Sequence, residues 1–179
     1  MKFSLGISAV VITLAAGVAL NAQKTTQVHP GKGGSPHVRT EWAIDGANIS
    51  IEYGRPSLKG RAEAQVMPPG AEWRTGADEA TVLKTDKSLM FGSVMVPAGS
   101  YALYTVPGEK EWQLVIVKTI PSWGIPYPKG NDLGRAPMTV AKNAAPVEQL
   151  TISLQDTPKG GEMRVEWGTV SARVPFMVH

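Results

Sequence analysis

The sequence predicts an all-β fold, an antiparallel β-sandwich of about ten short strands with two long loops, preceded by an N-terminal signal peptide. Short segments in which apolar and polar residues alternate recur along the chain, with turn-forming residues between them. No long segment has the period of an amphipathic helix. Many short strands joined by turns are typical of sandwiches and barrels. The long loops over 54–75 and 119–134 favour the sandwich, because they suit its ends.

The first 22 residues have the anatomy of a secretory signal peptide. Lys2 provides the positive start, an apolar run extends over 5–20, and small residues crowd its end. We expect cleavage after Ala22, with cleavage after Ala19 as an alternative. An uncleaved anchor is the other interpretation, although the run is short for a span of about 20 apolar residues. The sequence therefore predicts an exported protein, periplasmic or extracellular, with no membrane span in the mature chain.

The rest of the chain is expected to form one domain. Residues 23–36 are polar and rich in Gly and Pro, which predicts a flexible lead-in. Residues 37–179 then form a single β-sandwich domain, large enough to be held together by its core. The chain has no cysteine, which excludes thiol nucleophiles, iron–sulfur clusters and Cys-ligated zinc.

The first strands of the domain carry the clearest pattern in the chain. Apolar residues alternate with polar ones over 40–44 and again over 49–53. Asp45-Gly46 lies between these segments and suits a type I′ turn, because glycine accepts a positive φ. The sequence therefore predicts a β-hairpin.

The elements that follow are expected in the order of the chain. A short helix fits 61–66, and strands are expected over 80–85, 89–96, 101–106, 111–118, 135–142 and 147–155. Residues 114–117 are apolar without a break, which indicates a strand covered on both faces. Pro137 favours an edge position or a bulge. Alternating apolar residues at 163, 165 and 167, and then at 172, 174, 176 and 178, indicate the last strands.

Charge and motif content narrow the partners. Loss of Lys2 with the signal leaves 17 basic side chains (18 less one) against 15 acidic ones, well interspersed, so no nucleic acid partner is expected. P-loop, zinc-protease and serine-hydrolase motifs are absent, and no cofactor is expected. The histidines sit in the lead-in (His29, His37) and at the last residue (His179), where ligands are not preorganised, so we expect no metal site.

Three segments concentrate polar and aromatic residues outside the strand pattern, over 53–61, 73–81 and 123–135. They contain the candidate ligand-binding residues Arg55, Lys59, Arg61, Trp73, Arg74, Asp78, Glu79, Trp123, Tyr127, Asp132 and Arg135. One interpretation is that the arginines converge on an anion, because guanidinium groups hold carboxylate or phosphate with paired hydrogen bonds. The other is that they pair with carboxylates and pin the loops to the sandwich. Trp123 and Tyr127 lie in a loop and are the better candidates for contact with a ligand such as a sugar.

Several motifs together resemble the bacterial exported proteins grouped as domain-of-unknown-function family 2911. They are Ser35-Pro36, Tyr53-Gly54-Arg55-Pro56 with Lys59-Gly60-Arg61, Trp73-Arg74-Thr75-Gly76-Ala77 with Glu79-Ala80-Thr81, Pro97-Ala98-Gly99 with Tyr101, Glu111-Trp112, Trp123-Gly124 with Tyr127, Asp132 with Arg135, and Glu166-Trp167. The resemblance covers about 35–178 and implies export and a mostly β domain, with no assigned activity. Two departures are Pro69, where members of the family have an aromatic residue, and Asp78, where they often have Asn. Asp78 places a negative charge beside Arg74 and so favours the ion-pair interpretation.

Three hypotheses for function follow, none with a catalytic residue assigned. The first is a non-catalytic domain that binds a small polar ligand, a glycan or an envelope protein through the three polar segments. The second is a hydrolase of envelope or scavenged polymers, which needs two carboxylates about 5–9.5 Å apart in an open cleft. Its carboxylates would come from Asp78, Glu79, Asp132 and Glu166. The third is a structural envelope protein without a ligand, which predicts a surface without a sizeable hollow.

Overall fold

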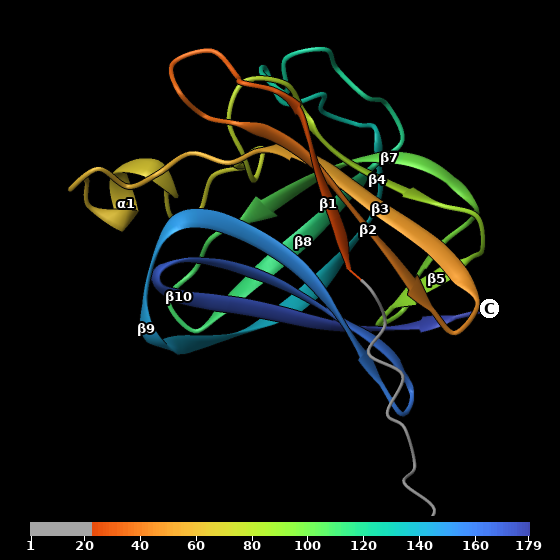
Figure 1. The fold of residues 1–179 in the computed structure, drawn as a ribbon. Helices are drawn as coiled ribbons and strands as arrows, with labels where there is room; N and C mark the ends of the chain where they lie inside the picture. The colour runs from red at the N-terminus through yellow and green to blue at the C-terminus, as the bar shows by residue number, and fades with distance from the viewer. Residues whose placement is uncertain (1–22) are drawn as a thin grey trace, which may run out of the picture.

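The computed structural model describes residues 23–179, so the predicted signal peptide at 1–22 lies outside the described residues. The described part contains ten antiparallel strands and one short helix (Figure 1). Their bounds are β1 (Lys24–His29), β2 (His37–Ile44), β3 (Ala47–Gly54), α1 (Glu63–Val66), β4 (Thr81–Thr85), β5 (Leu89–Phe91), β6 (Val94–Val96), β7 (Gly99–Val106), β8 (Glu111–Val117), β9 (Asp132–Thr157) and β10 (Gly160–Val178). No helix among these residues has the length and apolar character that a membrane crossing requires.

The strands form one hydrogen-bonded sheet in the order β1-β2-β3-β4-β7-β8-β9-β10-β5-β6. The sheet curves around a shared interior, so that β2 packs against β9 and β10 as well as pairing with β1 and β3. In Figure 1 the orange β2 and β3 cross in front of β8, while the blue β9 and β10 curl below them. The predicted all-β antiparallel fold is confirmed, and the two layers of the expected sandwich belong to a single curved sheet.

Alternate residues of the strands fill the interior. Trp42 of β2, Ile51 of β3, Leu114 of β8 and Val165 of β10 are all buried in one cluster. Each large apolar side chain buried in this way stabilises the fold by about 1.5–3 kcal/mol. The core therefore supplies the cohesion that a chain without disulfides needs.

The predicted hairpin is confirmed as β2 and β3. Ile44 pairs with Ala47 at its end. The turn residues Asp45 and Gly46 have φ angles of 47° and 73°, the positive values that a type I′ turn requires. Trp42 lies opposite Ile49, and both side chains point into the core.

The lead-in differs from the expectation. Instead of a flexible segment over 23–36, the structure has β1, whose register with β2 runs from Lys24 opposite Glu41 to Gln27 opposite Val38 and, after a shift, to His29 opposite His37. β1 is an edge strand with exposed side chains. Alternating apolar residues mark a strand only where one of its faces is buried. β1 buries neither face, so its sequence has the composition of a polar linker.

The expected single strand over 89–96 is a hairpin instead, made of β5 and β6. Phe91 pairs with Val94, and Gly92 takes a φ of 59° in the two-residue turn between them. Leu89, Phe91, Val94 and Val96 are all buried. The turn interrupts a run that would otherwise fit one continuous strand.

The last two strands are much longer than expected. The predicted strands over 135–142 and 147–155 are parts of β9, and the two terminal segments are parts of β10. The buried positions of β10 change from odd numbers (Met163, Trp167) to even numbers (Ala172, Val174) across register shifts beside Gly168, whose φ is 59°. Such a bulge turns the following side chains to the other face.

The prediction that β8 is covered on both faces is confirmed. Leu114 and Ile116 belong to the main core, whereas Val115 and Val117 pack with Tyr104 in a second cluster on the outer face. Pro137 lies opposite Gln113 of β8. The pairing of β9 with β10 includes residues from Thr139 onward, so Pro137 has no partner on β10. This stretch of β9 is therefore a local edge, as the proline favours.

The predicted helix is confirmed over four residues as α1. Its Glu63 Oε1 accepts hydrogen bonds from the backbone N–H (2.6 Å) and the hydroxyl (2.9 Å) of Thr169. These bonds attach the helix to β10 just after its bulge.

Candidate functional site

The arginines of the predicted binding loops each hold a different part of the fold. Arg55 donates to the carbonyl of Leu150 and the hydroxyl of Thr151 on β9, both at 3.0 Å. Arg61 donates to the carbonyls of Leu58 (2.9 Å) and Ser57 (2.6 Å) within its own loop. Loop carbonyls need such donors because no ladder partner satisfies them.

Arg74 has the same role between two loops. Its guanidinium donates to the carbonyls of Asp78 (2.8 Å) and Trp123 (2.9 Å). Asp78 in turn accepts a hydrogen bond of 2.8 Å from the backbone N–H of Lys32 through its carboxylate. Arg74 therefore binds the backbone carbonyl of Asp78 instead of forming the predicted ion pair with its carboxylate. The Asp78 carboxylate binds the loop after β1.

Asp132 and Arg135 form the ion pair that the pinning interpretation predicts. Arg135 donates to Asp132 (2.9 Å) and to Glu72 (3.2 Å). The Tyr127 hydroxyl donates a short hydrogen bond to Asp132. Burial, and next the bond to Asp132, raise the pKa of Tyr127 to about 12. This cluster ties the loop over 118–131 to the start of β9.

The remaining predicted residues are divided between the core and the surface. Trp73 is buried, stacks on Trp167 with ring centroids 5.8 Å apart, and meets the edge of Trp112. Lys59 is exposed and its backbone N–H binds Glu148. The ammonium of Lys32 lies 4.9 Å from the ring centroid of Trp123. Each predicted arginine contacts its own partners, so the structure favours pinning over convergence on one anion.

A hollow of about 590 Å³ lies elsewhere, on the outer face of β1–β4 and β7, and we call it the groove. Its lining residues are Lys24, Arg39, Glu41, Trp42, Ala43, Asn48, Ile49, Ser50, Glu52, Val82, Lys84, Asp86 and Ser100. None of the predicted candidates is among them. The loop residues therefore stay a prediction, and the groove is a second place where a ligand would fit.

The strand registers place five groove residues in a single row. Lys24 pairs with Glu41, Glu41 with Ser50, Ser50 with Lys84, and Lys84 with Ser100. Because facing residues of adjacent antiparallel strands point to the same side, these polar side chains stand next to one another. None of the five makes a side-chain hydrogen bond or ion pair with the described residues, 23–179.

Other groove residues are held in place by one another. Arg39 donates to Glu52 with bonds of 2.9 and 2.6 Å. Asp86 accepts hydrogen bonds from the Asn48 side chain (2.6 Å) and backbone N–H (2.7 Å), which lower the pKa of its carboxyl group. The groove thus combines fixed polar pairs with the unpaired row.

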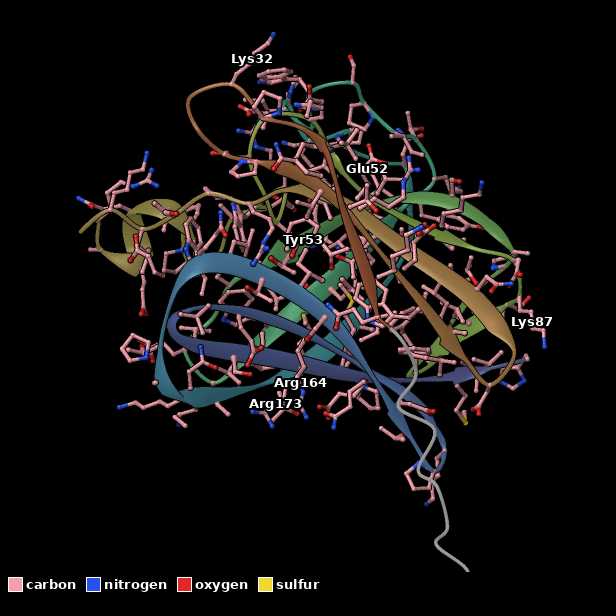
Figure 2. All side chains as sticks on the ribbon, in the orientation of Figure 1. Lys32, Glu52, Tyr53, Lys87, Arg164 and Arg173 are labelled. Carbon is pink, nitrogen blue, oxygen red and sulfur yellow. The ribbon has the colours of Figure 1, made fainter. Side chains whose placement is uncertain are left out.

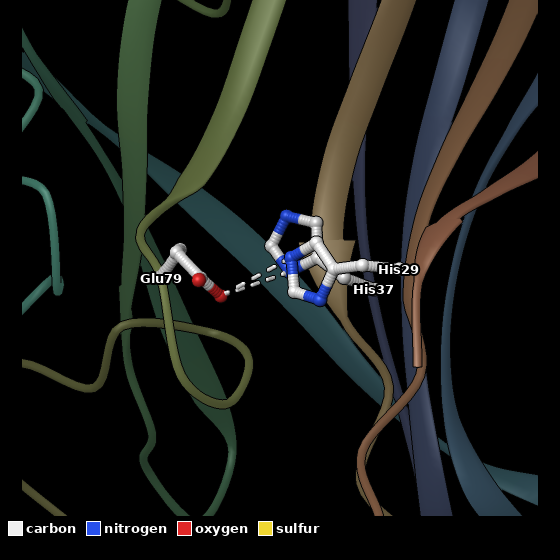
Figure 3. A group of neighbouring side chains, drawn as sticks. All are labelled: His29, His37 and Glu79. Carbon is white, nitrogen blue, oxygen red and sulfur yellow. Dashed lines mark ion pairs between the residues drawn. The ribbon is translucent and has the colours of Figure 1, made fainter. Parts of the chain in front are cut away.

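A cluster of three residues lies at one end of the same sheet face (Figure 3). We call His29, His37 and Glu79 the histidine cluster. The imidazole rings stack with centroids 4.7 Å apart, and the carboxylate of Glu79 points at both. His37 follows the same outward alternation of β2 as Arg39, and its Nε2 lies 3.5 Å from Glu52 Oε1. Burial lowers the pKa of His37, and the nearby carboxylates oppose this shift.

The expectation that the histidines lie in a flexible segment is wrong for these two. His29 ends β1, His37 begins β2, and the two residues face each other in the register. A hairpin brings together the residues on either side of its loop, so the sequence His29-Pro-Gly-Lys-Gly-Gly-Ser-Pro-His37 held a usable signal. That signal depends on recognising β1 as a strand.

Packing around glycine brings Glu79 to this place. A Cβ on Gly54 would lie 2.2 Å from the Ala77 carbonyl oxygen, and one on Gly76 would lie 2.8 Å from the Thr81 hydroxyl. Gly54 faces His37 in the β2–β3 register. The segment before β4 therefore lies directly on the end of β3 and carries Glu79 to the histidines.

The comparison with known proteins agrees with the motifs. No curated protein and no solved structure matches the chain. A model of the family described as "Protein of unknown function (DUF2911)" matches residues 35–176. The matched range takes in His37, Glu52 and Glu79 and most of the groove, whereas β1 lies before it. Because the match covers most of the sequence, the chain belongs to the DUF2911 family of proteins of unknown function.

Proposed function

We propose that this protein is an exported, non-catalytic binding domain whose groove takes a small zwitterionic ligand, of the class of amino acids and short peptides. The observation that carries the proposal is the row of unpaired side chains across five strands. Lys24, Glu41 and Lys84 alternate in charge, and none has a partner of its own within residues 23–179. Side chains that are held by a sheet and left without partners are available to a ligand.

The spacing of the row suits a molecule with two charges. Neighbouring strands lie about 4.8 Å apart. The backbones of Lys24 and Glu41 are therefore separated by one strand spacing, and those of Glu41 and Lys84 by two. A ligand carboxylate would pair with a lysine while its ammonium group pairs with Glu41. Ser50 and Ser100 add hydroxyl groups for the atoms between the charges.

The same lining gives less support to a glycan. Sugar rings bind best where an aromatic face is exposed. Trp42 is the aromatic residue of the lining, and it is 5% exposed because its side chain belongs to the core. A structural protein without a ligand is also less well supported, because that hypothesis predicts a surface without a sizeable hollow.

Asp86 and Glu52 of the groove give a hydrolase no support, and Glu41 alone does not supply the two carboxylates that a glycosidase needs. A glycosidase acid needs a raised pKa, but the pKa of Asp86 is lowered, and Glu52 is held by Arg39. Of the four carboxylates named by the hydrolase hypothesis, Asp78 accepts a hydrogen bond from the Lys32 N–H and Glu79 faces the histidines. Asp132 pairs with Arg135, and Glu166 accepts a long bond from Ser171.

The test uses the exported, purified protein and measures its melting temperature with glycylglycine. A ligand that binds the folded state raises this temperature. We expect glycylglycine to stabilise the wild type, and the doubly capped dipeptide, which lacks both charges, to have no effect. Glu41→Gln and Lys84→Met should abolish the stabilisation. Lys87→Met is the matched control, because Lys87 follows β4 but lies outside the lining (Figure 2).

Two outcomes would contradict the proposal. One is the absence of any stabilisation by glycylglycine or by free amino acids at millimolar concentration. The other is an equal stabilisation of the wild type and of both groove variants, since the ligand would then bind elsewhere.

A further inference from the structure

The histidine cluster contains buried polar atoms that lie within ion-pair distance of one another but make no hydrogen bond. His37 is 2% exposed, and its Nδ1 makes no hydrogen bond. The Oε2 atom of Glu79 is also buried and makes none. The two atoms lie 3.4 Å apart. Unsatisfied polar atoms in a buried place are rare, and such a pair needs an explanation.

The carboxylates around His37 favour one placement of its ring proton. Its Nε2 lies 3.5 Å from Glu52, and Glu52 is in turn held by two hydrogen bonds from Arg39. A neutral imidazole carries one N–H. With that proton directed at Glu52, the lone pair of Nδ1 faces the carboxylate of Glu79. Two electron-rich atoms then face each other, and a cation between them would satisfy both.

We propose that His29, His37 and Glu79 bind a divalent transition-metal ion of the zinc class. Two ligands of a tetrahedral zinc ion at about 2.1 Å are about 3.4 Å apart. The carboxylate oxygen of Glu79 lies 3.4 Å from His37 Nδ1 and 3.7 Å from His29 Nε2. Ligand atoms of all three residues lie within 4.8 Å of one another. Three protein ligands leave a fourth position open.

The support behind the ligands matches that of metal sites in general. A histidine ligand usually donates its second N–H to a carboxylate, which sets its tautomer and orientation. Glu52 stands in that position behind His37. Two imidazoles and one carboxylate suit zinc, nickel and copper, whereas magnesium and calcium prefer sites made of oxygen.

His29 must turn to join the ion. In the structure its Nδ1 accepts a hydrogen bond of 3.1 Å from the Gly31 N–H, and its ring lies 9° from parallel with His37. Ligation through Nε2 requires a proton on Nδ1, so the bond to Gly31 must open, and the ring must tilt to aim its lone pair at the ion. The side chain of His29 is 38% exposed, which leaves room for this rotation.

Bound metal would link three parts of the chain. His29 ends the edge strand β1, His37 begins β2, and Glu79 precedes β4. The site lies beside the groove and shares Glu52 with its lining, but the inference does not depend on a ligand in the groove.

The test is titration of the untagged, exported protein, freed of metal by chelation, with zinc chloride in a calorimeter. We expect one ion per chain, and no binding of magnesium at the same concentration. His29→Ala and Glu79→Gln should each weaken the binding at least tenfold. Both positions are partly exposed, so these variants avoid the folding risk of changing buried His37. His179→Ala is the matched control, because it removes the one histidine outside the cluster.

A cobalt titration provides a second readout, because tetrahedral cobalt absorbs visible light more strongly than hydrated cobalt. Glu52→Gln should weaken binding about 10- to 100-fold, the cost of losing an outer-sphere partner. Absence of saturable zinc binding to the wild type would overturn the proposal. So would zinc binding that His29→Ala and Glu79→Gln retain in full, since the ion would then lie elsewhere. His29→Ala should keep the stabilisation by glycylglycine, so the two proposals fail separately.

Discussion

The phenolic oxygen of Tyr53 accepts a hydrogen bond of 2.9 Å from the backbone N–H of Ile152. This bond joins β3 to β9, which are not neighbours in the sheet, through the buried interior. Figure 2 shows Tyr53 between the band of β3 and the curved β9. The two layers of the fold are therefore connected by a polar contact as well as by apolar packing.

Replacing Tyr53 with phenylalanine leaves the ring and removes this acceptor. The N–H of Ile152 would then be buried without a partner, which costs about 1–3 kcal/mol. We expect Tyr53→Phe to lower the free energy of unfolding in urea by that amount. Tyr101→Phe is the control, because the Tyr101 hydroxyl makes no hydrogen bond within residues 23–179. An equal loss in both variants would assign the effect to the hydroxyl group in general.

Gly54→Ala tests the close approach that places Glu79. The added methyl group would meet the carbonyl oxygen of Ala77 at 2.2 Å, and forced packing of this kind costs about 1–3 kcal/mol. Gly33→Ala is the comparison. A Cβ added at Gly33 would have no atom within 4 Å, so the loss of stability in this variant measures only the cost of a side chain at a φ of +69°. We expect Gly54→Ala to weaken zinc binding as well, because the segment that carries Glu79 must shift. Unchanged zinc affinity would contradict this coupling.

Local signals explain which parts of the fold could be predicted. The β2–β3 hairpin depends on Asp45-Gly46 and on the alternation beside it, all within a few residues. The strand β1 shows no such pattern, because its side chains are exposed and only its backbone pairs with β2. The hairpin of β5 and β6 was missed although Gly92-Ser93, which separates the apolar residues 89–91 and 94–96, is a two-residue turn signal.

The groove could not be predicted, for a different reason. Glu41 and Lys84 resemble ordinary solvated residues on the outer face of a strand. They meet in one row only through the registers of β2–β3 and β3–β4. The paired residues of β3 and β4 lie 30 to 36 positions apart, from Glu52–Val82 to Ile49–Thr85, across the segment that includes α1. The loop arginines stood out because they interrupt the strand pattern, but Arg55 donates to a carbonyl and a hydroxyl of β9, and Arg74 donates to two loop carbonyls.

Arg74→Met separates the pinning role of this residue from anion binding. The change removes charged hydrogen bonds to the carbonyls of Asp78 and Trp123, and we expect a loss of about 2–3 kcal/mol in the free energy of unfolding. Arg164→Met is the control, because Arg164 pairs with Glu162 at the surface (Figure 2), where such a pair contributes at most about 1 kcal/mol. Sulfate should stabilise the wild type and Arg74→Met equally. If sulfate stabilised the wild type but not Arg74→Met, the result would instead support an anion site at Arg74.

The pH dependence of stability should reveal the contact between Asp86 and Asn48. Two hydrogen bonds from Asn48 stabilise the ionised carboxylate, so the pKa of Asp86 in the folded state lies below its ordinary value of 3.8. A lowered pKa means that this stabilisation is complete above the unfolded value and disappears as the pH falls through the folded one. We expect Asp86→Asn to be less stable than the wild type at pH 7, with a difference that shrinks steadily below about pH 4. Urea midpoints measured across this range give the comparison. Asp45→Asn, at the tip of the neighbouring hairpin, controls for the loss of one surface charge. If the difference in stability between the wild type and Asp86→Asn stayed constant down to the lowest pH, the Asn48 bonds would not depend on the ionised form of Asp86.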